Sequence, residues 1–192
     1  MPNNFVNTSS SSPTVTSHVG VAGVGGSFDP QFVSAGSATY TNNNLTAACG
    51  GRGGAVGNTA ILEGQQRYWE IHIDSWGGLY GPLIGILPKG AVDYNDVHAV
   101  TIWVAGAGAP QVYRDGAQGT VGYPYGVAIT VGDTVGVLLD LDANTITFFK
   151  NGVSMGIAAS DVVLSEYYAY VSSPGSSYPC TLTANFGASP FM

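Results

Sequence analysis

The chain has 192 residues, of which 28 are glycine and 9% are charged, with 5 Lys and Arg against 12 Asp and Glu and a formal net charge of −7. An ordinary soluble domain has about 25% charged residues, yet 45% of this chain is hydrophobic, which excludes an intrinsically disordered protein. The five dispersed cations offer no phosphate-binding surface, so we expect no nucleic-acid partner. No apolar run reaches the roughly 18 to 20 residues that insert into a membrane.

The N-terminal segment, residues 1–26, is rich in Ser, Thr and Gly, and Ser9 to Ser12 follow one another directly. Such a segment buries too little to form a core of its own. We therefore expect an N-terminal arm at 1–26 and one domain at 27–192, with the arm docked on another subunit or on its own domain. The arm has neither the basic region nor the apolar region of a secretory signal.

The remainder of the chain is typical of short strands separated by turns. Residues 67–74 alternate polar and apolar, and residues 134–141 place Val and Leu at every second position. The next strands are expected at 145–150 and 153–157, joined by Asn151-Gly152, a pair that accepts the positive φ of a two-residue hairpin. No long segment has helical periodicity, so the pattern predicts an all-β antiparallel meander.

Two cysteines, Cys49 and Cys180, lie far apart in the sequence and match no metal-ligand spacing. A disulfide between them would require the first and last strands to be neighbours. We expect two buried free thiols instead, because no export signal indicates an oxidising compartment.

Several motifs follow one another along the chain: Arg67-Tyr68-Trp69-Glu70-Ile71, Gly85-Ile86, Tyr113-Arg114-Asp115-Gly116, Gly132-Asp133-Thr134-Val135-Gly136-Val137, Ile146-Thr147-Phe148-Phe149-Lys150-Asn151-Gly152 and Ala184-Asn185-Phe186-Gly187. Their order resembles the signature of the SPRY domain family, over roughly residues 27–192. The resemblance implies a two-sheet antiparallel β-sandwich of the concanavalin-like jelly-roll type. It also implies a binding module that recognises partner proteins through loops at one end of the sandwich. The low charge and many glycines resemble SPRY copies in bacteriophage and bacterial proteins.

Aromatic side chains on two loops are the candidate contacts, because Tyr and Trp with Arg nearby are the usual composition of binding hot spots. The loops are 93–98 and 113–125, and a third candidate loop follows Trp76. The competing interpretation is that these tyrosines only cap the end of the sandwich and pack on prolines such as Pro124. The candidate binding residues are Trp76, Tyr80, Asp93, Tyr94, Asn95, Tyr113, Arg114, Asp115, Tyr123 and Tyr125.

Catalysis has little support in the sequence. Glu70, His72 and Asp74 share one strand face, as the carboxylates of a glycosidase of this fold would, but a solvent-facing polar strand explains all three. The three histidines are scattered, no cysteine has an activating partner, and Asp140 and Asp142 lack the surrounding ligands of a calcium loop. We therefore expect no enzyme, no catalytic residue, no metal and no cofactor.

The leading hypothesis is a structural binding module of a phage virion, a capsid-decoration or tail-associated protein. In it, the arm binds a capsid, tail or sister subunit, and the loops face a host-surface protein or glycan. The first alternative is a carbohydrate-binding adhesin that stacks sugars on Trp76 and the loop tyrosines. The second is an intracellular adaptor that binds a short peptide between the loops. Outside a virion, the expected location is the cytoplasm.

Overall fold

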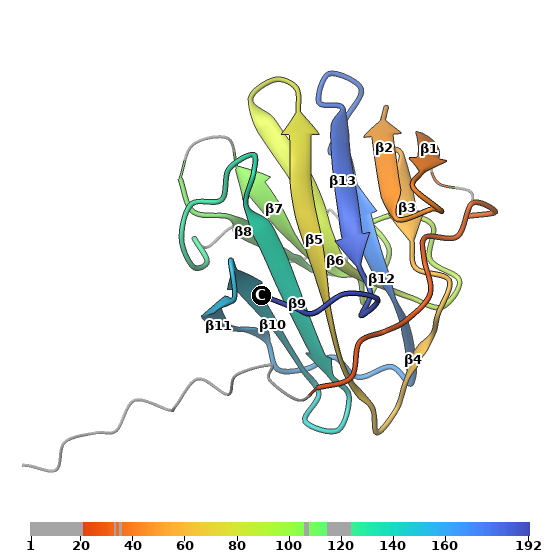
Figure 1. The fold of residues 1–192 in the computed structure, drawn as a ribbon. Helices are drawn as coiled ribbons and strands as arrows, with labels where there is room; N and C mark the ends of the chain where they lie inside the picture. Colours follow the sequence, from red (N-terminus) through yellow and green to blue (C-terminus); the bar gives the residue numbers. More distant parts are fainter. Residues whose placement is uncertain (1–20, 33, 35, 106–107, 115–123) are drawn as a thin grey trace, which may run out of the picture.

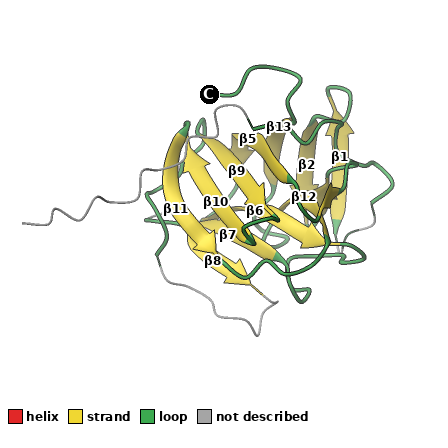
Figure 2. Ribbon diagram, turned by 90° about the horizontal axis from the view of Figure 1, so that it is seen from below, coloured by secondary structure: helices red, strands yellow, loops and turns green. Residues whose placement is uncertain are grey.

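The computed structural model describes residues 21–192 except 33, 35, 106–107 and 115–123, and every regular element of this part is a β-strand. The strands form two antiparallel sheets stacked as a sandwich (Figure 1, Figure 2). The all-β class and the two-sheet sandwich predicted from the sequence are thus confirmed. The described part of the chain contains no helix long and apolar enough to cross a membrane.

The seven-stranded sheet runs in the order β1 (Ser37–Thr41), β2 (Thr46–Gly50), β13 (Cys180–Asn185), β5 (Gln66–Trp76), β9 (Thr134–Asp140), β10 (Thr145–Lys150) and β11 (Val153–Ala159). The six-stranded sheet runs in the order β3 (Gly54–Val56), β12 (Glu166–Ser172), β6 (Tyr80–Pro88), β7 (Val100–Ala105) and β8 (Gln111–Arg114), with β4 (Ile61–Leu62) paired to β12.

The predicted strands correspond to four neighbours in the larger sheet. Residues 67–74 lie within β5, and the predicted segments 134–141, 145–150 and 153–157 correspond to β9, β10 and β11. Asn151 and Gly152 join β10 to β11 with φ of 49° and 77°, as the hairpin required.

The core lies between the sheets, where alternate residues of each strand meet. Trp69, Ile71 and Ile73 of β5 point inward and are fully buried, and Ile84 and Ile102 of the opposite sheet pack in the same cluster. This alternation leaves every second residue of each strand on an outer face. The chemistry of the two outer faces therefore depends on the remaining residues and on the loops that cover them.

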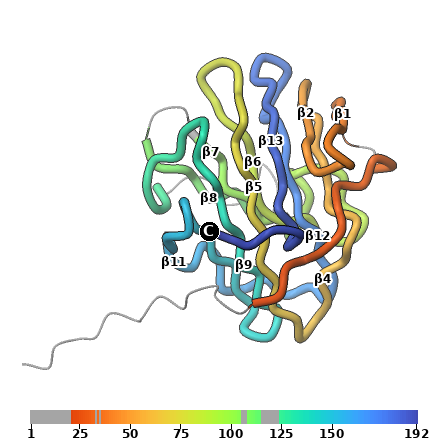
Figure 3. The backbone as a smooth tube through the Cα atoms, in the orientation of Figure 1, coloured from red at the N-terminus to blue at the C-terminus, as the bar shows by residue number. Residues whose placement is uncertain are grey.

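Both ends of the described chain lie against the seven-stranded sheet (Figure 3). The Tyr68 amide donates to Ala22 O at 3.1 Å, the Gly25 amide donates to Phe186 O at 2.7 Å, and Val24 is buried. Residues 21–26 of the predicted arm thus pack on their own sandwich. Residues 1–20 lie outside the described residues, and the docking predicted for them stays a prediction.

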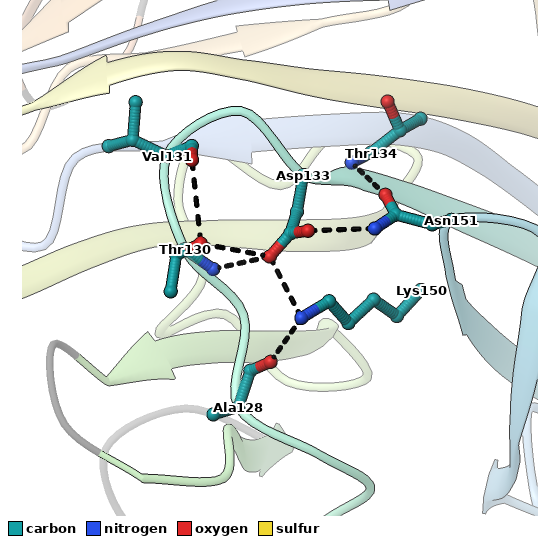
Figure 4. Close-up of polar contacts among 7 residues, drawn as sticks. All are labelled: Ala128, Thr130, Val131, Asp133, Thr134, Lys150 and Asn151. Atoms are coloured by element: carbon teal, nitrogen blue, oxygen red, sulfur yellow. Dashed lines mark hydrogen bonds and ion pairs between the residues drawn. The ribbon is translucent and has the colours of Figure 1, made fainter.

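The loop before β9 is fastened to the β10–β11 hairpin by Asp133 (Figure 4). One carboxylate oxygen accepts from Asn151 Nδ2 at 2.7 Å, and the other accepts from the Thr130 amide at 2.7 Å and faces Lys150 Nζ at 3.0 Å. Lys150 also donates to Ala128 O at 2.7 Å. The loop from 128 to 133 is therefore held at both ends of its turn.

Candidate functional site

The outer face of the six-stranded sheet carries a second apolar cluster. Leu83 and Leu87 of β6 and Tyr170 of β12 point away from the main core and are buried beneath loop residues, among them Tyr94. Phe32 packs on the same cluster from the segment before β1. Loops thus cover this sheet face, and aromatic residues dominate the contact.

Five aromatic rings form a continuous chain across this face, which we call the aromatic row: Tyr178, Tyr80, Trp103, Tyr113 and Tyr94. Consecutive ring centroids lie 5.0, 4.7, 5.5 and 6.2 Å apart, mostly edge to face. Three of the rings belong to adjacent strands, β6, β7 and β8, and the other two come from the β12–β13 and β6–β7 loops. Such edge-to-face pairs add roughly 0.5–1.5 kcal/mol each beyond area burial, so these contacts stabilise the arrangement of the rings.

The aromatic row borders a small hollow of about 80 Å³, lined by Leu83, Tyr94, Trp103, Tyr113 and Pro174. Within the row, Tyr80 is 38% exposed, whereas Tyr94, which lines the hollow, is 8% exposed. Burial raises the pKa of Tyr113 above its ordinary value, and the neighbouring Tyr94 and Tyr80 raise it further. Its hydroxyl therefore stays neutral and able to donate at physiological pH.

On β7, the strand that carries Trp103, two polar atoms have no hydrogen-bond partner among the described residues. They are Trp103 Nε1 and Thr101 Oγ1, both on β7, and both atoms are buried. The Thr101 side chain is on the outer face and is fully buried. An unpaired buried donor costs roughly 1–3 kcal/mol, and such groups are rare in folded proteins. A ligand that offered an acceptor to the indole N–H would remove this cost.

The loop that carries Tyr94 is held by its own carboxylates. Asp96 accepts hydrogen bonds from the amides of Val92 (2.6 Å) and Asp93 (3.0 Å), and Asp93 accepts from the Asn95 amide at 2.7 Å. The Asn95 side chain donates to the other oxygen of Asp93 at 3.3 Å. Asp93 and Asn95, predicted as contacts, thus shape the loop that positions Tyr94.

A larger groove of about 500 Å³ lies beside the same loop, lined by residues that include Asp29, Phe32, Lys89 and Tyr168. Its polar groups are mostly engaged. Lys89 and Tyr168 both donate to Glu166, at 2.8 and 2.6 Å, and Asp29 accepts the Gln31 amide at 2.9 Å. The aromatic row is the stronger candidate because its indole donor, Trp103 Nε1, has no partner among the described residues.

The structure brings together three of the predicted contacts, Tyr80, Tyr94 and Tyr113, from three separate parts of the sequence. Arg114 follows Tyr113 and forms an ion pair with Asp161. Asp115 and Tyr123 lie outside the described residues.

Two other predicted contacts lie elsewhere. Trp76 ends β5 opposite Cys180, packs on the main core and lines a different groove, of about 460 Å³, at the seven-stranded sheet. Tyr125 is 6% exposed, and its hydroxyl accepts from the Phe148 amide at 3.2 Å and donates to Gly156 O. A surface contact through Tyr125 does not fit this burial.

Sequence reasoning missed Trp103 and Tyr178. Trp103 could have been found, because Val100, Ile102 and Val104 alternate inward and leave position 103 on the outer face. Tyr178 lies in a loop rich in Ser, Pro and Gly, where no periodicity gives the direction of a side chain.

The polar face of β5 differs from the expectation in one residue. Glu70 does not face solvent: it is 4% exposed, and its carboxylate accepts hydrogen bonds from the Met192 amide at 2.8 Å and the Tyr68 hydroxyl at 3.2 Å. The C-terminal segment covers it, because Phe191 packs on Tyr68 with ring centroids 4.8 Å apart. His72 contacts Thr134 at 3.1 Å, and Asp74 accepts from Thr183 at 2.7 Å.

In the described part of the chain, no three His, Cys, Asp or Glu residues are grouped so that they could hold a metal ion. Asp140 has a structural role instead: it accepts the amides of Asp142 and Ala143 in the β9–β10 turn, at 3.0 and 2.9 Å.

Comparison with known proteins decides the family, since the SPRY domain model matches residues 66–189. The chain belongs to the SPRY family. Ran-binding protein 9 of Xenopus tropicalis is 40% identical over 72 residues, and Ran-binding protein 10 of Danio rerio is 38% identical over 72 residues. Each alignment covers 37% of this chain but only 12% and 11% of the relative, so the chain corresponds to a small part of those proteins.

Solved SPRY structures confirm the fold. The SPRY domain of human HERC1 superposes with a TM-score of 0.67 at 21% identity, over 85% of this chain and 99% of that one. The TRIM65 PSpry domain gives 0.61 at 11% identity, over 83% and 88%. The expected likeness to bacteriophage copies gains no support from these matches, and neither does a virion role. The peptide-binding alternative fits them better.

Proposed function

We propose that this SPRY domain is a protein-interaction module that binds a short peptide segment of a partner protein, without catalysis, across the aromatic row. The observation that carries the proposal is the row itself, with an unpaired buried indole N–H beside a small hollow. Tyr and Trp are among the residues that contribute most to protein recognition.

The peptide would supply two kinds of group. An apolar side chain fits the hollow between Leu83 and Pro174, where ring faces and edges surround it. A backbone carbonyl or side-chain oxygen of the peptide would accept the hydrogen bond from Trp103 Nε1, once the side chains that bury this atom shift on binding. Because β6, β7 and β8 are hydrogen-bonded neighbours, these groups are placed without a folding step on binding, which limits the entropic cost.

The comparisons support the class of ligand. Ran-binding protein 9 is named for binding Ran, so its name records a protein partner, and 72 residues of this chain align with it. The proposal for this chain concerns a peptide segment of a partner, recognised by the chemistry of the row.

A matched pair of tryptophan variants tests the proposal. Random peptides are selected on the immobilised full chain, and the affinity of the best peptide is measured by fluorescence polarisation. Trp103→Phe keeps an aromatic ring but removes the N–H, so we expect an affinity loss of about tenfold or more, as for a lost buried hydrogen bond. Tyr80→Ala should weaken binding as well, since it removes a half-exposed ring from the row.

Trp76→Phe is the control, because it makes the same chemical change away from the row. The expected result is an affinity within about twofold of the wild type. If Trp76→Phe abolished binding while Trp103→Phe left it intact, or if no peptide were selected at all, the proposal would be wrong.

A further inference from the structure

The two cysteines lie directly opposite each other in the seven-stranded sheet, although 130 positions separate them in the sequence. Cys49 of β2 is the register partner of Cys180 of β13, and both are free thiols, 2% and 3% exposed. A hydrogen bond between the two thiols raises the pKa of Cys180, and burial raises it further. The side chains are therefore in contact on the core side of the sheet.

The backbone geometry permits a disulfide at this position, but with strain. The Ala184 amide donates to Leu45 O at 2.7 Å, and alternation along the ladder makes Cys180–Cys49 a hydrogen-bonded pair as well. Such pairs have Cα atoms about 5.5 Å apart, within the 4.4–6.8 Å of disulfides. The Cβ atoms must approach to about 3.8 Å, so the strands have to shift, and strained disulfides are the more easily reduced ones.

Each cysteine is adjacent in the sequence to a segment that is connected to the candidate site. Cys180 begins β13 directly after the loop 173–179, which contributes Pro174 to the hollow and Tyr178 to the aromatic row. Cys49 is one residue from the turn 50–53, and the Ser173 amide donates to Gly53 O at 3.0 Å. A shift of the Cys49–Cys180 pair therefore moves the attachment points of both segments.

An oxidant reaches the two thiols when this end of the sheet opens locally, because both cysteines are buried and their side chains lie on the core side. The groove of about 460 Å³ is lined by Cys49 and Cys180 and by small neighbours that include Ala48, Gly50 and Thr181. β2 is separated from solvent only by the edge strand β1, and strands near a sheet edge open locally at lower cost than central ones.

We propose that Cys49 and Cys180 are a reversible dithiol–disulfide pair that controls the position of the 173–179 loop and thereby the aromatic row. With glutathione disulfide as oxidant, one cysteine thiolate attacks it and releases a glutathione thiolate. The second cysteine thiolate then attacks the mixed disulfide and releases another. Two electrons and two protons pass from the cysteines to two glutathione molecules, and one S–S bond replaces another. The consequence for ligand binding rests on the proposed function.

The chemical half of the proposal is tested by thiol trapping on the native full chain. The protein is equilibrated in buffers that differ in the ratio of reduced to oxidised glutathione. Its free thiols are then alkylated, and its mass is measured by mass spectrometry. We expect both alkylation sites to disappear together at a finite ratio and to return on reduction, with no glutathione retained. Cys49→Ser, as control, should keep Cys180 from forming an internal disulfide. The proposal would be overturned if both thiols stayed free at the highest ratio of oxidised to reduced glutathione, or if a stable glutathione adduct formed.

The structural half is tested without any ligand, so its failure is distinct from a failure of peptide binding. The chain is labelled with 5-fluorotryptophan, and the ¹⁹F resonances are assigned with Trp76→Phe and Trp103→Phe. Oxidation should shift the Trp76 resonance, since Trp76 is the β5 neighbour of Cys180, and the Trp103 resonance in the aromatic row. Both shifts should vanish in Cys49→Ser. A shift of Trp76 with no change at Trp103 would refute the link to the site.

Discussion

Tyr113 and Tyr125, both predicted as contacts of the 113–125 loop, have different roles in this domain. Tyr113 on β8 belongs to the aromatic row, whereas Tyr125 inserts its hydroxyl between β10 and β11 where their register shifts. There it accepts from the Phe148 amide and donates to Gly156 O, so it closes a bulge that would leave two backbone groups unpaired.

The structure predicts that Tyr125→Phe lowers stability but leaves peptide binding unchanged. Loss of the hydroxyl leaves the buried Phe148 amide without its partner, at a cost of roughly 1–3 kcal/mol. Urea unfolding measures the loss, and the peptide affinity of the folded variant is the control. Unchanged stability with weakened binding would show that Tyr125 is a contact residue after all.

Among the elements, the β9–β11 region shows which features a local sequence pattern predicts and which it does not. Alternation and the Asn151-Gly152 pair predicted its strands and turn, because each is a local property of backbone and side chain. The contact between Asp133 and Asn151 depends on how the loop before β9 returns to the hairpin, which no local pattern specifies.

The hydrogen bonds and the ion pair of Asp133, here called the Asp133 anchor, should make the free energy of unfolding depend on pH in the acid range. Burial by itself raises the pKa of Asp133, but hydrogen bonds from Thr130, Asn151 and Lys150 and the Lys150 charge outweigh it, so the pKa lies below its ordinary value. A carboxylate of this kind stabilises the folded state above about pH 4, its unfolded pKa, and the contribution disappears as the pH falls through the lower folded pKa.

Asp133→Asn should therefore be less stable than the wild type at pH 7, and the difference should shrink steadily below pH 4. Urea midpoints between pH 7 and pH 2 measure this. Asp142→Asn, an exposed aspartate in the β9–β10 turn, is the matched control and should follow the wild type. A difference between wild type and Asp133→Asn that stayed constant with pH would contradict the anchor's ionic character.

The candidate site was predictable in part for the same physical reason. Tyr94 and Tyr113 stood out as aromatic residues in polar, glycine-rich segments, but their meeting with Tyr80 and Trp103 depends on sheet order. Trp76 has the same residue type and a similar turn context, yet its strand ends on the other sheet. Sequence alone could list aromatic candidates but could not sort them into two separate faces.

At the scale of the whole molecule, the two outer faces of the sandwich differ. The seven-stranded sheet is covered in part by the two ends of the described residues, with Val21 and Phe191 packed on Tyr68 and its neighbours. On the same face, Thr183 forms hydrogen bonds with Thr46 and Asp74. The six-stranded sheet instead carries the aromatic row, in which the Trp103 indole N–H has no partner among the described residues. The low charge of the chain thus accompanies a candidate binding surface that is mainly aromatic.

The most direct test of the central claim is chemical-shift mapping of the ¹⁵N-labelled chain with the selected peptide. Binding across the aromatic row predicts that the largest shifts fall on the Trp103 indole N–H and on the amides of β6, β7 and β8. The Trp103 indole signal should move downfield, as a donor that gains an acceptor does. Largest shifts on the Trp76 indole and on β1, β2 and β13, with the Trp103 indole unmoved, would contradict the account.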